Sequence, residues 1–460
     1  MRFFLLSMLA FLCFGCAEKT PTNIEEASLP NIVLLIGDDQ GYPYFGFMGA
    51  DYVHTPNMDS LAARGTVFTQ GYVPANHCRP SLQSLMTASL PWDYNKQVEA
   101  LWTEHYQELD TTPDNLAAAK ADFDHHAMQH FPTLPRLLAE KGYASFQGGK
   151  WWEYHYENGG FTHGMTTGWT TEERKNGSKW FKQFMGGNGL KLARYTMQPA
   201  YDFIDAHTEQ PFFLWFAPEL PHYPFDAPEK YYNQYADMDM TESAKRYYAN
   251  CTWFDDGVGA LVSYLREKGL YENTLFVYVN DNGWEQGPTQ EFRSDSLRWH
   301  NGGDKGKLSV YDQSFRTPII FAWPGKITSG QYRQQLVHSS DIPVTIMDYL
   351  NIEKPEGVFG QSLRDLLAGS AEQHRSHIVG YAQKMRSEAD MMGMDIHAYW
   401  LRDSTWFYSW NMTTGVERLH HILDDPNSDQ NVVEEHPVQV ALFQEQINRW
   451  REARWREAEE

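Results

Sequence analysis

Residues 31–39 read Asn31-Ile-Val-Leu-Leu-Ile-Gly-Asp-Asp39, and this stretch decides the fold. Its apolar part does not alternate with polar residues, which is typical of a strand buried on both faces of a sheet. Apolar runs at 211–217 and 274–279 predict two more such strands, and a helical pattern over 243–268 separates them. Because strands alternate with helices, the sequence predicts an α/β fold with a large, mostly parallel sheet flanked by helices on both faces.

The rest of the chain predicts elements that complete this architecture. Helices are expected at 56–65, 78–87 and 134–141, and a further strand at 143–147. Residues 92–130 are polar, acidic and rich in His, which predicts a helical or looped insertion. Short strands are expected at 377–382, 397–402 and 405–411, and a charged helix at 437–460. We therefore expect a main domain over 31–350 and a C-terminal α+β subdomain over 351–460, with a small antiparallel sheet plus helix.

The composition excludes one class of partner and keeps another open. The chain has 460 residues and a formal net charge of −22, so it lacks the excess of Lys and Arg that nucleic-acid binding needs. Aromatic residues make up 15% of the chain. They are consistent with surfaces that stack on sugars, although most individual rings are expected to lie in the core.

The N-terminus predicts export. Met1-Arg2 precedes an apolar run over 3–14 that is too short to span a bilayer, which is typical of a signal peptide. Leu12-Cys-Phe-Gly-Cys16 resembles a bacterial lipobox, with Cys13 where an aliphatic residue is usual. We expect a signal peptide and lipobox over 1–16 and a polar linker over 17–30. The mature chain is then a lipoprotein of the cell envelope (outer membrane or periplasm) anchored at Cys16, or a secreted protein.

Oxygen-bearing side chains follow two of the predicted strands. Asp38 and Asp39 end the first strand, and Asp281 and Asn282 follow the strand at 274–279. Carboxyl ends of parallel strands meet at one edge of the sheet, and four such oxygens suit Ca²⁺ or, alternatively, Mg²⁺ better than Zn²⁺. The alternative for Asp281-Asn-Gly283 alone is a simple turn.

Cationic residues and one cysteine complete the candidate site. Lys150, Lys307 and His222 lie beyond strands or in a Pro-flanked loop, and together they suit a tetrahedral oxyanion, although each alone is commonly a surface residue. Cys78 starts the helix expected at 78–87. Cys251 is the other cysteine beyond the signal region, so a Cys78–Cys251 disulfide is the structural alternative to a chemical role.

The ordered set of motifs resembles type I, formylglycine-dependent sulfatases of the alkaline-phosphatase-like superfamily, of the bacterial polysaccharide-type. The tail over 417–431 is also similar to the family's C-terminal segment. The stretches that carry the resemblance are Asn31-Ile-Val-Leu-Leu-Ile-Gly-Asp-Asp-Gln-Gly41, His54-Thr-Pro-Asn-Met-Asp-Ser-Leu-Ala62, Cys78-Arg-Pro-Ser81, Gly149-Lys-Trp151, Pro221-His222, Asn280-Asp-Asn-Gly283 and Lys307-Leu-Ser-Val-Tyr-Asp-Gln-Ser-Phe-Arg-Thr-Pro318.

The resemblance implies a chemistry for these residues. Cys78 would be converted to formylglycine (3-oxoalanine) by a separate maturation enzyme, and a hydroxyl of the hydrated aldehyde would attack sulfur. The metal ligands for Ca²⁺ would be Asp38, Asp39, Asp281, Asn282 and the modified Cys78. Lys150 and Lys307 would hold sulfate oxygens, and His222 would bind the ester and protonate the departing alcohol.

Two positions depart from the family pattern. Four residues after the cysteine, where the family carries an arginine that contacts the nucleophile and serves recognition by the maturation enzyme, this chain has Leu82. Arg79 is the nearest substitute, but it points elsewhere on a helix. The family's Lys-x-His is replaced by Lys150-Trp-Trp152, which removes the histidine that deprotonates the diol. His155 and, less directly, His163 are candidates to replace it.

The expected substrate is a sulfated polysaccharide or oligosaccharide. Export, aromatic richness and the insertions at 92–130 and 160–200 favour a carbohydrate. One alternative is a phosphodiester or phosphonate monoester hydrolase on the same fold, which the Leu82 departure favours. The other is a surface glycan-binding protein whose catalytic site has decayed.

Overall fold

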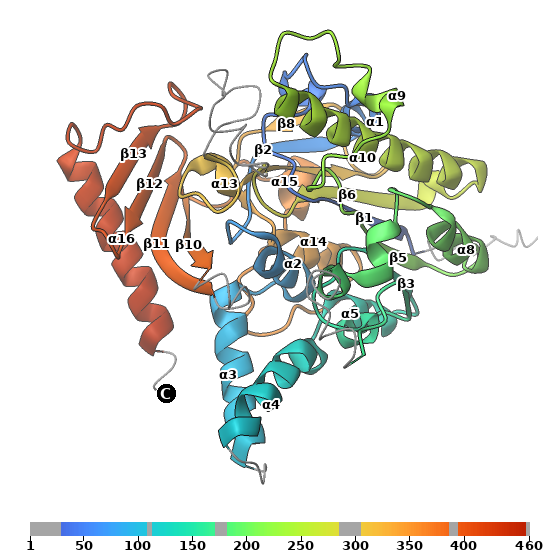
Figure 1. Cartoon of the computed structure of the whole chain (residues 1–460), viewed down its shortest axis with the longest axis horizontal. Helices are drawn as coiled ribbons and strands as arrows, with labels where there is room; N and C mark the ends of the chain where they lie inside the picture. Colours follow the sequence, from blue (N-terminus) through green and yellow to red (C-terminus); the bar gives the residue numbers. More distant parts are fainter. Residues whose placement is uncertain (1–28, 108–112, 171–181, 285–304, 386–393, 457–460) are drawn as a thin grey trace, which may run out of the picture.

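The computed structural model describes residues 29–107, 113–170, 182–284, 305–385 and 394–456 (Figure 1). The expected signal, the lipobox and most of the linker lie outside these residues. Among the helices of the described segments, none combines the length and the apolar composition needed to cross a lipid bilayer.

A large mixed sheet forms the centre of the molecule, as predicted. It has nine strands in the order β4-β3-β5-β1-β6-β7-β2-β8, with β9 paired to β2. The pairs that join β3, β5, β1 and β6 are parallel, and β7 runs antiparallel to both β6 and β2. Its strands are β1 (Asn31–Gly37), β2 (Thr66–Tyr72), β3 (Ala144–Gly149), β4 (His163–Gly164), β5 (Phe212–Ala217), β6 (Thr274–Asn280), β7 (Arg316–Ala322), β8 (Gln331–Arg333) and β9 (Val337–His338).

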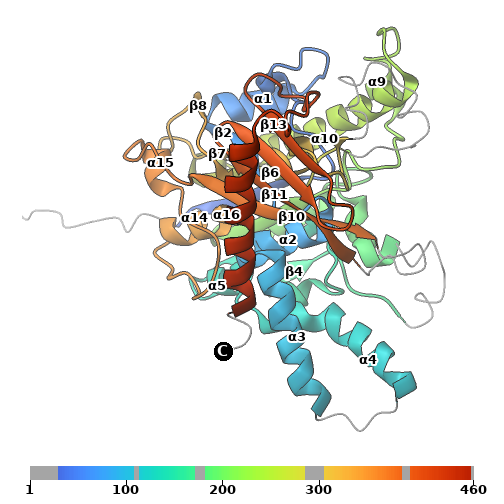
Figure 2. The ribbon, with the colours of Figure 1, turned by 90° about the vertical axis from the view of Figure 1, so that its left-hand side faces the viewer.

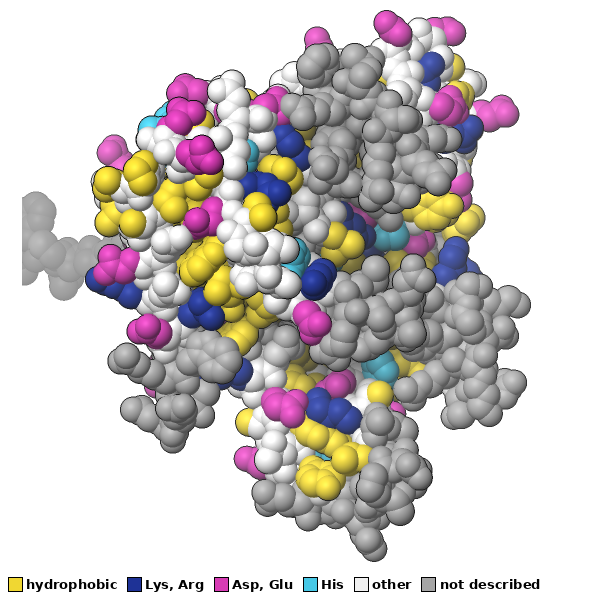
Figure 3. Space-filling view, turned by 60° about the vertical axis from the view of Figure 1, so that its left-hand side comes forward, with side chains coloured by type: hydrophobic (Ala, Val, Ile, Leu, Met, Phe, Trp, Pro, Cys, Tyr) yellow, Lys and Arg dark blue, Asp and Glu magenta, His cyan; other side chains and the backbone are white. Residues whose placement is uncertain are grey.

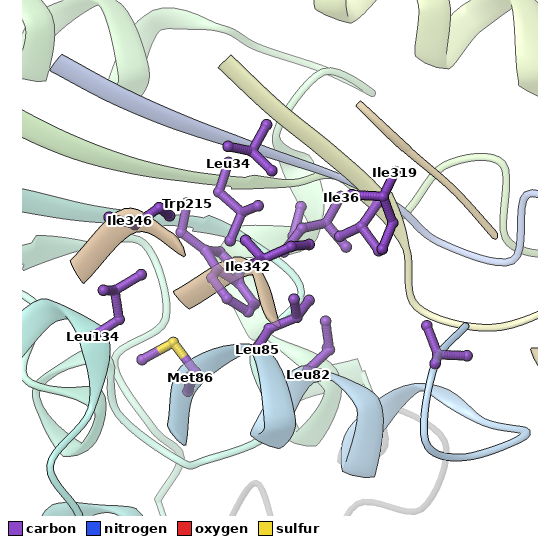
Figure 4. Close-up of a cluster of buried hydrophobic side chains, with 14 of the residues drawn as sticks. Leu34, Ile36, Leu82, Leu85, Met86, Leu134, Trp215, Ile319, Ile342 and Ile346 are labelled. Carbon is purple, nitrogen blue, oxygen red and sulfur yellow. The ribbon is translucent and has the colours of Figure 1, made fainter. Parts of the chain in front are cut away.

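Helices cover both faces of this sheet because alternate residues of β1 point to opposite sides. Leu34 and Ile36 join one apolar core with α2 (Cys78–Thr87), α5 (Leu134–Ala139) and α14 (Asp341–Tyr349) (Figure 4). Val33 and Leu35 join a second core with α1 (Pro56–Ala63), α8 (Gln198–Ala206) and α10 (Glu242–Glu267). The predicted two-faced α/β architecture is confirmed.

A second sheet lies beside the first. It is antiparallel, with strands β10 (His377–Met385), β11 (Met394–Asp403), β12 (Trp406–Asn411) and β13 (Glu417–His421). Trp400 and Phe407 on one face belong to the same core as α2. Tyr408 on the other face packs with Phe443 of α16 (Pro437–Arg456), which lies across the sheet (Figure 2). The predicted small sheet plus helix is confirmed, whereas the division of the chain at residue 350 stays a prediction.

The insertion expected at 92–130 is helical. It consists of α3 (Pro91–Gln107) and α4 (Pro113–His126), which project from the body of the molecule (Figures 1 and 2). The short α9 (Glu229–Tyr232), α13 (Asp312–Phe315) and α15 (Arg364–Ala368) and the 3-10 turns at Gly46–Met48, Ala127–His130, Tyr156–Gly159, Gly187–Lys191 and Tyr271–Asn273 complete the described elements.

Candidate active site

The acidic end of β1 is held in place by its neighbours in the sheet. The register pairs Gly37 with Asn280, so the residues that follow β1 and β6 leave the sheet side by side. The backbone N–H of Asp39 donates to Asp281 Oδ1 at 3.1 Å. Tyr247 of α10 donates its hydroxyl to the Asp39 carbonyl at 2.8 Å, and Asp39 has a left-handed φ of 65°. Strand pairing and hydrogen bonds therefore fix the positions of these carboxylates.

Three buried oxygens of this cluster have no hydrogen-bond partner in the described part of the chain. They are Asp38 Oδ2, Asp281 Oδ2 and Asn282 Oδ1. Atoms of Asp38, Asp39 and His222 that could bind a metal lie within 4.8 Å of one another. Buried oxygens without donors are costly, and a hard divalent cation is the partner that carboxylate and amide oxygens fit best. The predicted ligand residues Asp38, Asp39, Asp281 and Asn282 do converge.

Electrostatics at this edge also favour a cation. Burial, followed by the charge of Asp38, raises the pKa of Asp281 well above its ordinary value. Burial would also raise the pKa of Asp39, but the charges of Lys307, His222 and Lys150 outweigh it and lower that pKa below its ordinary range. The cluster thus contains one carboxyl that resists ionisation until more positive charge is supplied.

The two predicted lysines contact this cluster at different depths. Lys150, with 1% of its side chain exposed, donates from Nζ to Asp38 Oδ1 at 2.5 Å. Lys307, with 15% exposed, donates to Asp39 Oδ2 at 2.7 Å. Burial lowers the pKa of Lys150, but the charges of Asp38 and its neighbours hold it well above its ordinary value, so the ammonium stays charged. Lys150 therefore forms the floor of the site and Lys307 lies nearer its mouth.

His222 faces the same carboxylates, since its Nε2 lies 3.6 Å from Asp39 Oδ2. Its loop is held by two residues that the sequence analysis missed. Arg194 donates from Nη2 to the His222 carbonyl at 2.8 Å, and Asn250 donates to the same carbonyl at 3.3 Å. Arg194 also donates to the Glu219 carbonyl at 2.7 Å. No local sequence pattern marks these contacts, because they join segments 28 residues apart along the chain.

Cys78 occupies the first position of α2 and is buried. Its pKa is raised to about 11, mainly by burial, and the charges of Lys150, Lys307, Asp281 and Asp38 also act on it. The thiol is therefore close to the charged cluster and protonated near neutral pH. Cys78 and Cys251 are both free and belong to different cores, so the disulfide alternative is wrong.

The first departure from the family pattern has a packing explanation. Leu82, one helical turn after Cys78, is 4% exposed and lies in the apolar core beside Leu85 and Ile342 (Figure 4). Arg79 points away, as predicted, and binds both carboxylate oxygens of Glu153 at 3.0 Å. Glu153 also accepts from Gln83 at 3.1 Å. The family arginine is thus replaced by a core residue, and Arg79 is occupied by another partner.

The second departure places an aromatic ring beside the buried lysine. Lys150 Nζ lies 5.6 Å from the centre of the Trp152 ring. His155 caps a 3-10 turn by accepting from the Glu157 N–H at 3.3 Å. His163 lies exposed on the edge strand β4, where it pairs in register with Phe146 of β3 and packs against His207. The structure therefore brings neither candidate histidine into the cluster around Lys150.

The chain matches two sequence families. Residues 30–352 match the family described as Sulfatase, and residues 303–452 match the one described as N-sulphoglucosamine sulphohydrolase, C-terminal. The chain is 28% identical over 358 residues to N-acetylgalactosamine-6-sulfatase of Sus scrofa, an alignment that covers 71% of this chain and 63% of that protein. It is 23% identical over 483 residues to an arylsulfatase of Clostridium perfringens, covering 88% and 90% of the two chains.

Solved structures share the fold over almost the whole chain. A protein solved in complex with its substrate D-glucosamine-2-N,6-O-disulfate superposes with a TM-score of 0.70 at 16% identity, covering 93% of this chain and 98% of that one. This likeness shows the common fold, in which a large sheet and a small C-terminal sheet are combined.

Proposed function

Because the chain belongs to the sulfatase family, we propose that it hydrolyses sulfate esters of a carbohydrate. One observation supports this most strongly. Three unpartnered buried oxygens, the buried Lys150, the partly exposed Lys307 and His222 converge beside Cys78, which is the combination that a sulfate ester and a divalent cation would require.

We propose that residue 78 acts after conversion to formylglycine by a maturation enzyme. The unmodified thiol is a poor nucleophile here because its raised pKa of about 11 leaves it protonated near neutral pH. Converted to formylglycine, residue 78 would supply a hydrated aldehyde whose hydroxyl attacks sulfur. Residue 78 is the first residue of α2, and the charges of Lys150, Lys307, Asp281 and Asp38 act on its side chain, so the reactive group would lie close to the charged cluster.

The residues that would hold the metal are Asp38, Asp39, Asp281, Asn282 and the modified residue 78. When bound, Ca²⁺ or Mg²⁺ would supply Lewis-acid activation and neutralise charge on the sulfate. The cation would bind the unpartnered oxygens of Asp38, Asp281 and Asn282. Its charge would also offset the repulsion between Asp281 and the neighbouring carboxylates.

The remaining residues would bind the ester and move a proton. Lys307 is exposed enough to meet a sulfate oxygen, and Lys150 opposes negative charge from the floor. Trp152 lies against Lys150 and excludes water from it. His222, held by Arg194 and Asn250, would donate a proton to the departing alcohol.

The proposed substrate class is a sulfated oligosaccharide or polysaccharide. Its support is the similarity to N-acetylgalactosamine-6-sulfatase and the fold shared with a protein solved with a sulfated glucosamine. The test is sulfate release from a panel of sulfated glycans, sulfated monosaccharides and an aryl sulfate, with a matching phosphodiester and a phosphonate monoester. Faster turnover of the phosphorus esters would replace this proposal with the alternative of a phosphodiester or phosphonate monoester hydrolase. Glycan binding without any turnover would support the decayed-site alternative.

We also propose that the mature chain is exported and anchored through Cys16. The support is the charged start and short apolar run of the N-terminus, followed by its lipobox-like residues. Labelling cells with a radioactive fatty acid tests this, because a Cys16→Ser variant should lose the label. Label that stays on the variant would exclude this anchor.

A further inference from the structure

A pocket of about 280 Å³ opens beside the start of α2. It lies between α2, the projecting α3–α4 hairpin and β10, which come together below the large sheet in Figure 1. This volume is close to the lower end of small-molecule sites, so it suits a single sugar ring better than a longer chain. Its lining includes His77, Arg79, Gln83, Tyr94, Lys120 and Gln383.

Two polar groups in the pocket wall have no hydrogen-bond partner among the described residues. They are the Tyr94 hydroxyl and Gln383 Oε1, on side chains that are only 3% and 6% exposed. The Tyr94 ring stacks on Phe131 with ring centres 4.3 Å apart, so its hydroxyl is held in a fixed position. Buried polar groups without partners are costly, so these two groups are available to hydrogen-bond a ligand that enters the pocket.

The charged groups of the pocket are already neutralised by one another. Arg79 is bound by both oxygens of Glu153. Lys120 donates to Asp124 at 2.6 Å and lies 3.3 Å from Glu99. Acidic and basic side chains are likewise mixed over this side of the molecule (Figure 3). The pocket therefore differs from the Lys150–Lys307 cluster, where three buried carboxyl groups lie beside the two lysines.

Pocket and candidate active site share one short segment. His77 lines the pocket and precedes Cys78, and the charges of Lys307 and Lys150 both act on the His77 imidazole. Asn76 donates to the Gln383 carbonyl at 3.0 Å and accepts from the Gln383 N–H at 3.1 Å. The Asn76–His77 segment therefore joins the pocket wall at Gln383 to Cys78 of the candidate active site.

We propose that this pocket binds an uncharged sugar unit adjacent to the sulfated unit of the substrate, through the Tyr94 hydroxyl and the Gln383 amide oxygen. The inference rests on the proposed sulfatase function. A sugar hydroxyl can donate to Gln383 Oε1 and exchange a hydrogen bond with Tyr94, whereas a second sulfate or a carboxylate would find Arg79 and Lys120, the Arg and Lys among the described lining residues, already paired with carboxylates. The α3–α4 hairpin then selects the oligosaccharide, and the strand edge binds its sulfate.

The test compares Tyr94→Phe and Gln383→Leu with the unchanged protein. The substrate is the best sulfated sugar of the panel above, offered alone, joined to a neutral sugar, and joined to a uronic acid. Each variant should raise KM about three- to tenfold for the neutral disaccharide, the effect of one hydrogen bond, and leave the monosaccharide KM unchanged. Tyr106→Phe, which removes a hydroxyl from the exposed end of the same helix, is the matched control.

A binding measurement separates this inference from the proposed function. Calorimetry with Cys78→Ala protein should show tighter binding of the neutral disaccharide than of the sulfated monosaccharide, and Tyr94→Phe should remove that gain. This holds even if no ester is turned over. Equal affinity for the two ligands, tighter binding of the uronic acid disaccharide, or no binding of any panel member would overturn the inference.

Discussion

The carboxyl edge of the large sheet and helix α2 meet at the candidate site, but the edge carries charged side chains and α2 carries mainly apolar ones. The edge holds buried charged side chains that the pairing of β1 with β6 fixes in place. Three of its side-chain oxygens, on Asp38, Asp281 and Asn282, have no hydrogen-bond partner among the described residues. The face of α2 that carries Leu82 and Leu85 is apolar and fills the core. The contrast teaches that the sheet prearranges the charges, whereas the proposed reactive group would depend on modification of Cys78, whose surroundings keep the thiol protonated.

The largest effect is expected at the reactive group itself. Cys78→Ala should lower kcat/KM for sulfate esters by at least about a thousandfold, because in the proposed function the converted residue 78 supplies the hydroxyl that attacks sulfur. Rates of sulfate release check this. The matched control is Cys251→Ala, which removes the other buried thiol from the opposite core and should keep most of the activity. Substantial activity in Cys78→Ala would show that the residues at the sheet edge hydrolyse the ester without a reactive group at residue 78.

The next effect concerns proton donation from the His222 loop. His222→Ala should reduce hydrolysis of alkyl sulfates about a hundredfold or more, and should affect an aryl sulfate with a good leaving group much less. Arg194→Lys, which disturbs the loop and leaves the imidazole in place, should show the same leaving-group dependence to a smaller degree. An equal loss on both substrate types would assign His222 to binding alone.

The next prediction concerns metal binding at the charged edge and is measured by stability, so it does not depend on catalysis. Without a divalent cation, Asp281→Asn should raise or leave unchanged the Tm, because burial and the charge of Asp38 disfavour the ionised form of the Asp281 carboxyl that it replaces. In the unchanged protein, Ca²⁺ at about 100 times its Kd should add about 2.7 kcal/mol to the free energy of unfolding, and Asp281→Asn should lose most of that gain. The exposed Asp51→Asn is the control. Thermal unfolding with and without chelator measures both effects, and an unchanged Ca²⁺ response in Asp281→Asn contradicts this ligand assignment.

The smallest effect on activity is expected at Leu82. Leu82→Ala should lower the free energy of unfolding by about 2 to 5 kcal/mol, because it opens a cavity beside Leu85 and Ile342. The folded, converted protein should nevertheless change in kcat/KM by less than about twofold. Leu82→Met, which conserves volume, should cost less than about 1.5 kcal/mol. Denaturant unfolding and assays at low temperature separate stability from activity, and a large activity loss in Leu82→Met would give Leu82 a direct role at the site.

Much of this architecture could be predicted because its signals are local. The buried strands β1, β5 and β6 are continuous apolar runs, and α2 begins and ends at the predicted residues. Strand β7 escaped prediction because it contains Pro318, which argues against a strand inside a sheet. Strand β2 also escaped prediction, because Gln70 and Gly71 break its apolar pattern at the point where its register with β7 shifts. The small sheet also gained a fourth strand, β13, that the sequence analysis did not separate.

The residues of the site likewise fall into those that the sequence could predict and those that it could not. Residues at strand ends could be predicted because parallel strands deliver them to one edge. The residues that hold His222 and Asp39, namely Arg194, Asn250 and Tyr247, act through contacts that only the folded chain creates. The placement of His155 and His163 away from the cluster likewise depends on a turn cap and a strand register that local sequence does not display.

The most direct measurement is mass spectrometry of the peptide that contains residue 78, combined with the specific activity of the same preparations. Protein from its native host and protein made without a maturation enzyme would provide a range of conversion. We predict that the aldehyde and its hydrate are present at residue 78 and that sulfate release rises in proportion to their fraction. Full activity in protein whose residue 78 is entirely cysteine would contradict the account.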